Sequence, residues 1–340
     1  MVFFRADSNN IIAGGHIMRC MAIAKAMIDS GEKICFLVAD ENPVPVLSEN
    51  GLNYFVLHSD WQDLLTDVEQ VITLLKKENN PILLIDTYSI SKDYVEKLKP
   101  FARVVYLGSK LVPLGNLDLL VNYSTDIDYD FYNRNYSEKT ELLLGPAYAP
   151  LREEFKNAVK IYNNTIKHIL LTTGNTDGNH MVSDVLDLLV PFIEDTEIVI
   201  DTIIGRLYDD KESLLKNYND QHVCFHENVK SMSSLMRKCD LAISANGTTI
   251  YELAAIGLPT ITFAMVPEQV RSAETLSELG VVDYCGKSYE DREKCLRSIY
   301  NRVIYYLEHG DEMIKLAQKA HNLIDGNGCQ KIVNKILKLA

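Results

Sequence analysis

The sequence lacks several patterns that mark familiar classes of site. Its 340 residues include seven cysteines, an odd number, and none of them forms a CxxC pair. The nicotinamide fingerprint GxGxxG is absent, and so is the phosphate-loop pattern GxxxxGK[ST]. A Rossmann dehydrogenase and a P-loop nucleotidase are therefore disfavoured. Scattered, unpaired cysteines are typical of reduced thiols in a cytosolic protein.

Basic residues and long apolar runs are also scarce. The chain has 34 Lys and Arg against 47 Asp and Glu, a formal net charge of −13. Binding to nucleic acid or to an anionic membrane depends on basic side chains that neutralise phosphates, so neither partner is expected. No segment approaches the roughly 20 apolar residues of a membrane span, and the first residues do not resemble a signal peptide. These absences predict a cytoplasmic protein without a transmembrane segment.

What the sequence does contain is a regular alternation of short β-rich runs and helix-period segments, which is typical of parallel α/β sheets. Strands are expected near 2–6, 33–39, 53–57, 81–86, 102–107 and 118–122, and again near 167–174, 197–204, 222–226, 240–245, 259–264 and 281–285. Helices are expected at 16–31 and 61–80, and in three closing segments near 289–308, 310–324 and 328–338. In the first helix, the spacing predicts a buried stripe of Ile17, Met21, Ala24 and Ile28.

The chain is too long for one typical core and suits two domains. The joining segment, residues 142–165, is rich in turn residues and then charged, so we expect one domain over 1–148 and a second over 149–340. Two doubly wound halves predict a cleft between them, and ligands in open α/β sheets collect at the carboxyl ends of strands. Candidate site residues are therefore sought where strands end.

The first candidate segment follows the first expected strand and reads RADSNNIIAGGHIMRC over residues 5–20. Gly14 and Gly15 allow the backbone to approach a ligand closely. His16 and Arg19 lie three positions apart on the opening helix, so both can face the same pocket. The alternative is that the glycines form only a flexible turn and that His16 is a surface residue.

The second candidate segment covers residues 243–269, ISANGTTIYELAAIGLPTITFAMVPEQ. After a strand, Gly247, Thr248 and Thr249 open a helix whose N–H groups and hydroxyls can hold a diphosphate. Glu252, one turn further on, is placed to accept hydrogen bonds from ribose hydroxyls. Pro267–Gln269 forms a polar loop after the next strand, at the same sheet edge. The alternative is an ordinary βαβ unit with a threonine N-cap.

Three weaker candidates remain. Asp86 and Tyr88 follow the expected strand 81–86, although Asp86 could instead only satisfy loop amides. Residues 172–180, TTGNTDGNH, either touch a ligand or turn the chain into a helix. The alternating residues of HVCFH, at 222–226, share one strand face, as three metal ligands could. An ordinary strand is favoured there, because no further ligand spacing supports a metal site.

Taken together, these segments resemble one family in their order and spacing. The motifs are residues 5–20, IDTY at 85–88, LLGPAYAPLREEF at 143–155, TTGNTDGN at 172–179 and the segment 244–269. They resemble the UDP-2,4-diacetamido-2,4,6-trideoxy-altrose hydrolases of pseudaminic acid biosynthesis and related spore-coat polysaccharide proteins, over essentially the whole chain. The C-terminal half also looks like the N-acetylglucosaminyltransferase that completes the peptidoglycan lipid precursor. That likeness implies the GT-B architecture, two Rossmann-like domains facing across a cleft.

The resemblance implies that His16 is the catalytic residue, that Gly247–Glu252 with Gln269 hold UDP, and that Tyr88 lies near the sugar. On this basis we expect metal-independent hydrolysis of a UDP-activated 2,4-diacetamido-2,4,6-trideoxy sugar to free sugar and UDP. Neutral His16 would act as general base on water, and no cofactor is implied. The expected substrate-binding residues are Arg5, Asp7, Gly14, Gly15, Arg19, Asp86, Tyr88, Gly174, Asn175, Asn246, Gly247, Thr248, Thr249, Glu252, Glu268 and Gln269.

Three alternatives remain open. The same fold could transfer the sugar to an acceptor, as a GT-B glycosyltransferase with a UDP-sugar donor. It could also be a hydrolysing UDP-sugar 2-epimerase, or a catalytically silent nucleotide-binding protein. The stretch 40–130 shows little of the apolar and basic surface that transferases with membrane acceptors usually carry on this domain, which favours hydrolysis modestly.

Overall fold

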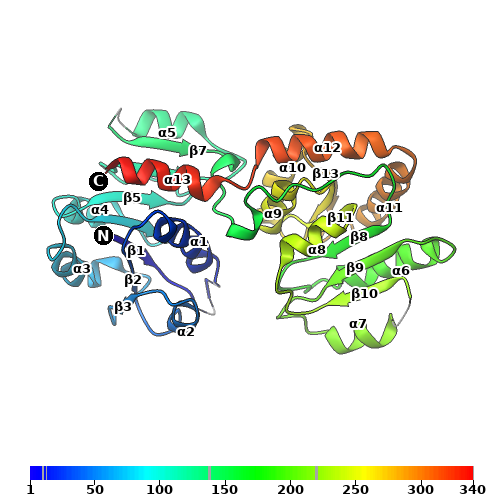
Figure 1. Ribbon diagram of the computed structural model, residues 1–340, viewed down its shortest axis with the longest axis horizontal. Coiled ribbons are helices and arrows are strands. Elements are labelled where there is room, and N and C mark those ends of the chain that lie inside the picture. The colour runs from blue at the N-terminus through cyan, green and yellow to red at the C-terminus, as the bar shows by residue number, and fades with distance from the viewer. Residues whose placement is uncertain (10, 13, 137–138, 219–220, 340) are drawn as a thin grey trace. The chain divides into compact units, whose positions relative to one another are not determined.

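The computed structural model describes residues 1–9, 11–12, 14–136, 139–218 and 221–339 and contains two compact units (Figure 1). Unit 1 is Met1–Glu153 together with Asn327–Ala340, and unit 2 is Glu154–Gly326. Each unit has its own parallel sheet with helices on both faces and its own buried core. Two parallel-sheet α/β domains were expected from the alternating pattern, and this fold class is confirmed.

Unit 1 is built on a seven-stranded sheet in the order β3-β2-β1-β4-β5-β6-β7, and every pair is parallel. Its strands are β1 Val2–Ala6, β2 Ile34–Val38, β3 Tyr54–Val56, β4 Ile82–Asp86, β5 Arg103–Leu107, β6 Leu119–Asn122 and β7 Glu141–Leu144. The strand order reverses between β1 and β4. Loops that follow these two strands flank the crevice where such sheets bind ligands.

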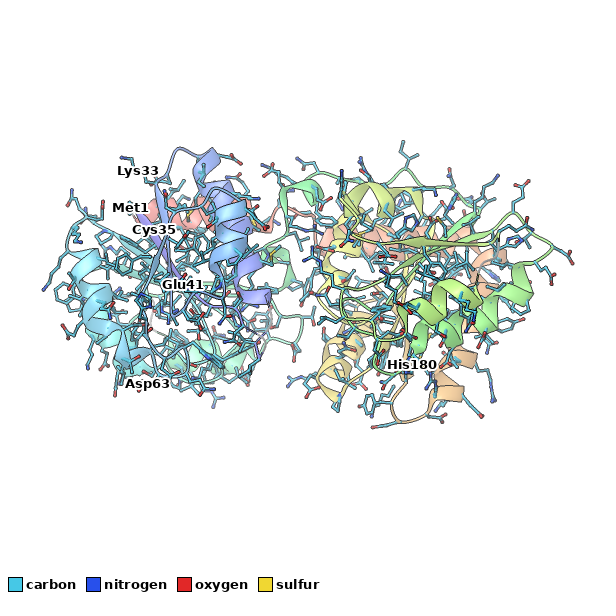
Figure 2. All side chains as sticks on the ribbon, turned by 90° about the horizontal axis from the view of Figure 1, so that it is seen from below. Met1, Lys33, Cys35, Glu41, Asp63 and His180 are labelled. Carbon is cyan, nitrogen blue, oxygen red and sulfur yellow. The ribbon has the colours of Figure 1, made fainter. Side chains whose placement is uncertain are left out.

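Helices cover both faces of this sheet. They are α1 Gly15–Asp29, α2 Val44–Glu49, α3 Val68–Leu75, α4 Lys92–Leu98, α5 Tyr129–Asn135 and α13 Gly328–Ile336, with short 3₁₀ turns Leu64–Thr66, Pro146–Tyr148, Glu153–Phe155 and Leu337–Leu339. Successive residues of β1 point to opposite faces. Phe4 therefore packs in the core that holds α1 and α13, whereas Phe3 packs in the core that holds α3 and α4. Met1, Lys33 and Cys35 lie at the start of the adjacent strands β1 and β2 (Figure 2).

Unit 2 has a six-stranded parallel sheet in the order β10-β9-β8-β11-β12-β13. Its strands are β8 His168–Thr172, β9 Val199–Ile203, β10 Val223–His226, β11 Leu241–Ala245, β12 Thr260–Ala264 and β13 Asp283–Lys287. Its helices are α6 Met181–Ile193, α7 Lys211–Asn217, α8 Met232–Lys238, α9 Thr249–Ile256, α10 Val270–Glu278, α11 Arg292–Glu308 and α12 Gly310–Leu323, with the 3₁₀ turn Pro267–Gln269. Here the order reverses between β8 and β11.

The C-terminal helix α13 belongs to unit 1, although the sequence analysis placed residues 327–340 in the second domain. Ile332, Val333 and Ile336 are fully buried in the same core as α1. Gly328 permits this packing, because a Cβ there would lie 2.1 Å from the carbonyl oxygen of Ala149. The other boundary between the two units lies between residues 153 and 154, within the joining segment.

Three further details differ from the sequence-based expectation. The strand β7 was assigned to the joining segment, because its leucines precede a turn-rich stretch. The expected helix over 61–80 is a 3₁₀ turn followed by the shorter α3, since Asp67 between them is buried and bonded to Arg5. On α1, Ile17, Met21 and Ala24 are buried as expected, whereas Ile28 is 44% exposed. Among the described residues, no helix has both the length and the apolarity to cross a membrane.

Candidate functional site

A histidine and an aspartate meet at the strand reversal of unit 1. His16 is the second residue of α1. Asp86 is the last residue of β4, and it pairs with Ala6 of the neighbouring strand β1. Nδ1 of His16 lies 2.6 Å from Oδ1 of Asp86, and both side chains are almost fully buried. An ionised carboxylate only accepts hydrogen bonds, so Nδ1 carries the proton and donates it. The lone pair of a neutral ring then lies on Nε2, which has no hydrogen-bond partner among the described residues.

Arg19 binds the same carboxylate. Its Nε donates to Oδ2 of Asp86 at 2.5 Å, its Nη2 donates to Oδ1, and its Nη1 donates to the hydroxyl of Tyr123 at 3.1 Å. Burial alone would raise the pKa of Asp86, but the Arg19 guanidinium and the hydrogen bond from His16 outweigh burial and hold that pKa below its usual range. Asp86 is thus a buried anion that orients His16 and is neutralised by Arg19. The thiol of Cys20 lies 3.5 Å from Oδ2, and burial raises its pKa.

Tyr88 follows in the loop after β4 and flanks the histidine. Its ring meets the His16 ring edge to face, with centroids 4.7 Å apart and planes at 90°. The residue is 64% exposed, so most of its surface is free to contact a ligand. Lys110, from the loop after β5, donates to the carbonyl oxygens of Tyr88 at 3.0 Å and Ile90 at 2.7 Å. This pair of hydrogen bonds holds the Tyr88 loop in place.

The two glycines before His16 are exposed, and they leave room beside the histidine. Gly14 is the N-cap of α1, and a Cβ at Gly15 would meet nothing within 4 Å. The structure therefore brings together Gly14, Gly15, His16, Arg19, Asp86 and Tyr88, all expected as site residues. Two residues of the same motif, Asn10 and Ala13, lie outside the described part of the chain.

Arg5 and Asp7, also expected to bind substrate, are instead buried structural residues. Arg5 is 0% exposed, and its Nε donates to Asp67 at 2.9 Å while its Nη1 donates to Asp7 at 2.5 Å. The other oxygen of Asp7 accepts from the backbone N–H of Ala39 at 2.7 Å. The hydroxyl of Tyr94 donates to Asp67 at 2.8 Å. Arg5 points to the α3 and α4 face of the sheet, because strand residues alternate, and it is enclosed there.

In unit 2, two expected loops are tied together at the carboxyl ends of β11 and β12. The amide Nδ2 of Asn246 donates to the carbonyl oxygen of Gln269 at 3.0 Å. The side-chain oxygen of Gln269 in turn accepts from the backbone N–H of Met265 at 2.8 Å. Asn246 is buried and Gln269 is half-buried. These bonds align the loop before α9 with the loop before α10.

The N-terminus of α9 opens beside these loops. Thr248 is exposed and caps the helix without a side-chain cap hydrogen bond, and Gly247 and Thr249 are half-buried. The first N–H groups of a helix have no acceptor within the helix, and they favour anions. Glu252 lies one turn later and is half-buried, whereas Glu268 is exposed on the loop before α10. This group has the composition of a phosphate-binding turn.

The loop after β8 reaches the same edge. Asn179 donates from Nδ2 to the carbonyl oxygen of Met265 at 3.3 Å, which joins the loops after β8 and β12. Gly174 has φ +91°, a conformation that favours glycine, and Asn175 is exposed. Asp177 accepts from the backbone N–H groups of Met181 at 3.0 Å and Val182 at 2.9 Å. Asp177 therefore helps to turn the chain into α6, which is the second of the two roles that the sequence left open for residues 172–180.

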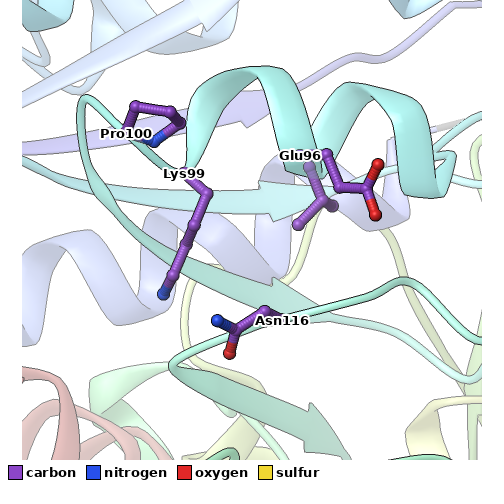
Figure 3. A pocket seen from close by; sticks show the side chains of 5 residues that line it. Glu96, Lys99, Pro100 and Asn116 are labelled. Carbon is purple, nitrogen blue, oxygen red and sulfur yellow. The ribbon is translucent and has the colours of Figure 1, made fainter.

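A hollow of about 280 Å³ lies elsewhere on unit 1, beside α4 (Figure 3). It is lined by Val95, Glu96, Lys99, Pro100 and Asn116. None of the expected site residues lines this hollow, and Lys99 is already paired with Asp118. It is therefore separate from the His16 cluster.

Sequence reasoning missed Tyr123 as a member of the His16 cluster. Its hydroxyl accepts a hydrogen bond from Arg19. Its ring also faces the Arg19 guanidinium, whose Cζ lies 5.8 Å from the centroid of the Tyr123 ring. Burial raises the pKa of the Tyr123 hydroxyl, which keeps it protonated at neutral pH. Tyr123 directly follows β6, so its place at the end of an expected strand was the available signal.

Solved structures share this two-unit α/β fold. Among solved structures, Acinetobacter baumannii MurG superposes with a TM-score of 0.67 at 13% identity and covers 99% of both chains. Anabaena Alr3699/HepE in complex with UDP-glucose superposes with a TM-score of 0.61 at 17% identity, over 100% of this chain and 99% of that one. The chain therefore has the GT-B glycosyltransferase fold, in agreement with the expectation from the C-terminal half.

Sequence comparison adds distant relatives. A family described as "Protein of unknown function (DUF354)" matches residues 143–277. An uncharacterized protein of Methanocaldococcus jannaschii is 26% identical over 73% of this chain and 52% of its own length. The UDP-2,4-diacetamido-2,4,6-trideoxy-beta-L-altropyranose hydrolase of Campylobacter jejuni is 29% identical over 52% of this chain and 61% of its length. Spore coat polysaccharide biosynthesis protein SpsG of Bacillus subtilis is 23% identical over 78% of this chain and 78% of its own length. The aligned part thus spans only about half of the first of these relatives.

Proposed function

We propose that the protein is a nucleotide-sugar enzyme that hydrolyses a UDP-activated 2,4-diacetamido-2,4,6-trideoxy sugar to free sugar and UDP, in the biosynthesis of a surface glycan. The observation that carries this proposal is the oriented histidine. Nδ1 of His16 donates a hydrogen bond to Oδ1 of Asp86, 2.6 Å away, which leaves Nε2 to accept a proton from water. The relative named as such a hydrolase supports the choice of substrate.

In the proposed reaction, Nε2 of His16 takes a proton from water as the water oxygen bonds to the anomeric carbon. The bond between that carbon and the phosphate oxygen breaks, and its electron pair leaves with UDP. Asp86 stabilises the imidazolium that forms. General-base catalysis of this kind contributes typically about 10²–10⁴ in rate.

The UDP would be held by unit 2. The N–H groups and hydroxyls at Gly247–Thr249 would bind the diphosphate, whose negative charge grows as the bond breaks. Glu252 would accept hydrogen bonds from the ribose hydroxyls. Gly174, Asn175, Asn246, Glu268 and Gln269 would complete the UDP-binding group of unit 2, and Arg19 and Tyr88 of unit 1 would bind the sugar. No metal or cofactor takes part in this proposal.

A glycosyltransferase is the second candidate, supported by solved structures with the same fold whose names identify them as glycosyltransferases. One assay separates the candidates: the protein is incubated with a panel of UDP-diacetamido sugars and no acceptor. Stoichiometric UDP release supports hydrolysis, and release only after an acceptor is added supports transfer. A free sugar with inverted C2, detected by NMR, identifies a hydrolysing epimerase. UDP binding by calorimetry with no turnover of any sugar identifies a silent binding protein.

A further inference from the structure

Four polar side chains gather on one face of the sheet in unit 2, outside the loops described above. They come from the neighbouring strands β8, β9 and β10 (Figure 1). Asp201, in the middle of β9, lies opposite Cys224 of β10. Its carboxylate is fully buried, while Cys224 is exposed and His226 is 24% exposed at its side chain.

Three of these groups offer ligand atoms to one point. A carboxylate oxygen of Asp201, the thiol sulfur of Cys224 and a ring nitrogen of His226 all lie within 4.8 Å of one another. Nε2 of His226 is 2.7 Å from Oδ1 of Asp201. Ligand atoms around one zinc ion lie about 3–4 Å apart, given bonds of about 2.0–2.3 Å. Small side-chain rotations therefore bring the three atoms to bonding distance of a single ion.

A fourth side chain supports the carboxylate from behind. Nδ1 of His168 lies 2.7 Å from Oδ2, the oxygen of Asp201 that does not contact His226. Carboxylates that bind metals are themselves commonly hydrogen-bonded in this way, and such outer partners orient the ligand. Lys238 also faces the cluster, with Nζ 3.3 Å from Oδ1, and its side chain is 51% exposed. Its ammonium would compete with a metal ion for Oδ1 of Asp201. Because the side chain is half exposed, it can move into solvent when an ion binds.

We propose that Asp201, Cys224 and His226 form a binding site for a divalent ion of borderline softness, such as Zn²⁺. Nitrogen, sulfur and a single carboxylate are the donors that this class of ion prefers, and Mg²⁺ and Ca²⁺ favour oxygen alone. Binding moves the His226 proton to Nδ1, so that Nε2 offers its lone pair, and releases the Cys224 thiol proton to solvent. Water completes the coordination, and the ion links the edge strand β10 to β9.

The strand pattern of the sequence pointed near this site but to a different set of ligands. His222, Cys224 and His226 alternate along the chain, yet His222 is buried and its Nδ1 donates to the carbonyl oxygen of Ile198 at 2.8 Å. The third ligand of the group is instead the carboxylate of Asp201, on the neighbouring strand β9. Because Asp201 is distant in sequence, only the pairing of β9 with β10 reveals the set.

The test uses the reduced, chelator-treated full-length protein titrated with Co²⁺, an optical substitute for Zn²⁺. We expect one bound ion per chain, a thiolate-to-cobalt absorption band in the near ultraviolet, and loss of the band when Zn²⁺ is added. Cys224→Ser removes the band, whereas Cys35→Ser, which alters a half-buried thiol in unit 1, retains it. Because Cys224 is exposed, its serine variant should fold normally, which thermal unfolding without metal verifies.

Two further variants probe the surrounding charges. His168→Ala should weaken Co²⁺ binding about 10–100-fold through the lost support of Asp201. Lys238→Met should tighten it, because the competing ammonium is gone. The proposal is overturned if the wild-type protein shows no thiolate-to-cobalt band, if the band persists in Cys224→Ser, or if Lys238→Met weakens binding.

Discussion

Nδ1 of His16 lies 2.6 Å from Oδ1 of Asp86, although the two residues are 70 positions apart in the chain. They meet because β1 and β4 are neighbours at the strand reversal of unit 1, so that the helix after β1 and the end of β4 share one crevice. Arg19 closes the cluster by donating to both oxygens of Asp86.

Replacing His16 with asparagine should abolish the base and keep a polar side chain. We expect turnover of the UDP-sugar to fall at least 100-fold, within the range of about 10²–10⁴ typical of general-base catalysis, while UDP affinity stays nearly unchanged. Steady-state kinetics and calorimetry measure the two quantities. His58→Asn is the matched control, because His58 is exposed in the same unit and its φ of 49° suits asparagine. Retained turnover in His16→Asn would remove the histidine from the mechanism.

Asp86 should make stability depend on pH. Burial raises the pKa of its carboxyl, but Arg19 and His16 outweigh burial, so the folded pKa lies below that of the unfolded chain. The stabilisation is then fully present above the unfolded pKa of about 3.9 and is lost as the pH falls through the lower, folded value. Urea unfolding of the wild type and Asp86→Asn over a pH series should show a stability difference that is constant near neutrality and shrinks below about pH 4. An unchanged difference at acid pH would contradict this assignment.

Arg19 and Tyr123 should differ greatly in their contribution to stability. Arg19→Met leaves the buried Asp86 anion without its cation, and breaking such a pair costs about 3–5 kcal/mol. Tyr123→Phe removes the hydroxyl that accepts the 3.1 Å hydrogen bond from Arg19, and the loss of that bond should cost about 0.5–1.5 kcal/mol. Urea unfolding at neutral pH compares the two variants. Equal losses would show that Arg19 does not neutralise Asp86.

The proposed ribose contact can be tested without catalysis. Glu252→Gln keeps the size of the side chain and removes its charge, and hydrogen bonds to charged groups contribute about 1.5–3 kcal/mol. We therefore expect UDP affinity to fall about 10-fold or more, measured by calorimetry. Glu278→Gln, on the exposed side of α10, serves as the control and should bind UDP like the wild type. Unchanged affinity in Glu252→Gln would exclude the ribose contact.

The C-terminal helix should stabilise unit 1 through its apolar face. Ile332 is fully buried in the core shared with α1, so Ile332→Ala should lower the free energy of unfolding by about 2–5 kcal/mol. Ile28→Ala, on α1 and 44% exposed, should lower it by much less. Thermal or urea unfolding measures both. Similar losses in the two variants would mean that α13 is not part of that core.

Most of the fold could be predicted from the sequence, because strands and helices leave short-range patterns. All twelve expected strands are present, and the three closing helices lie within a few residues of their expected positions. The strand β7 was not predicted, because its four residues are followed directly by glycine and proline and so resemble the start of a turn. The helix expected over 61–80 is interrupted at Asp67, whose partner Arg5 lies 62 positions away and is invisible to local periodicity.

The candidate site could be predicted in part. Loops after β1, β4, β8, β11 and β12 were identified because site residues in α/β sheets follow strands, and each of these loops lies at a strand reversal or next to one. Arg5 and Asp7 follow the same rule, yet the structure encloses them. Whether a charged side chain at a strand end meets solvent or a buried counter-charge depends on what packs against it, which a local pattern does not contain.

By itself, the sequence determined the alternation of strands and helices, the two-domain α/β class and the loops where chemistry was sought, since each is encoded by neighbouring residues. Only the tertiary structure decided which of those residues meet. The order of the strands brings Asp86 to His16 and Asp201 to Cys224, and the apolar face of α13 returns the end of the chain to the first unit. The physical reason is that these contacts join segments far apart in the chain, whose pairing depends on burial and charge within the whole folded unit.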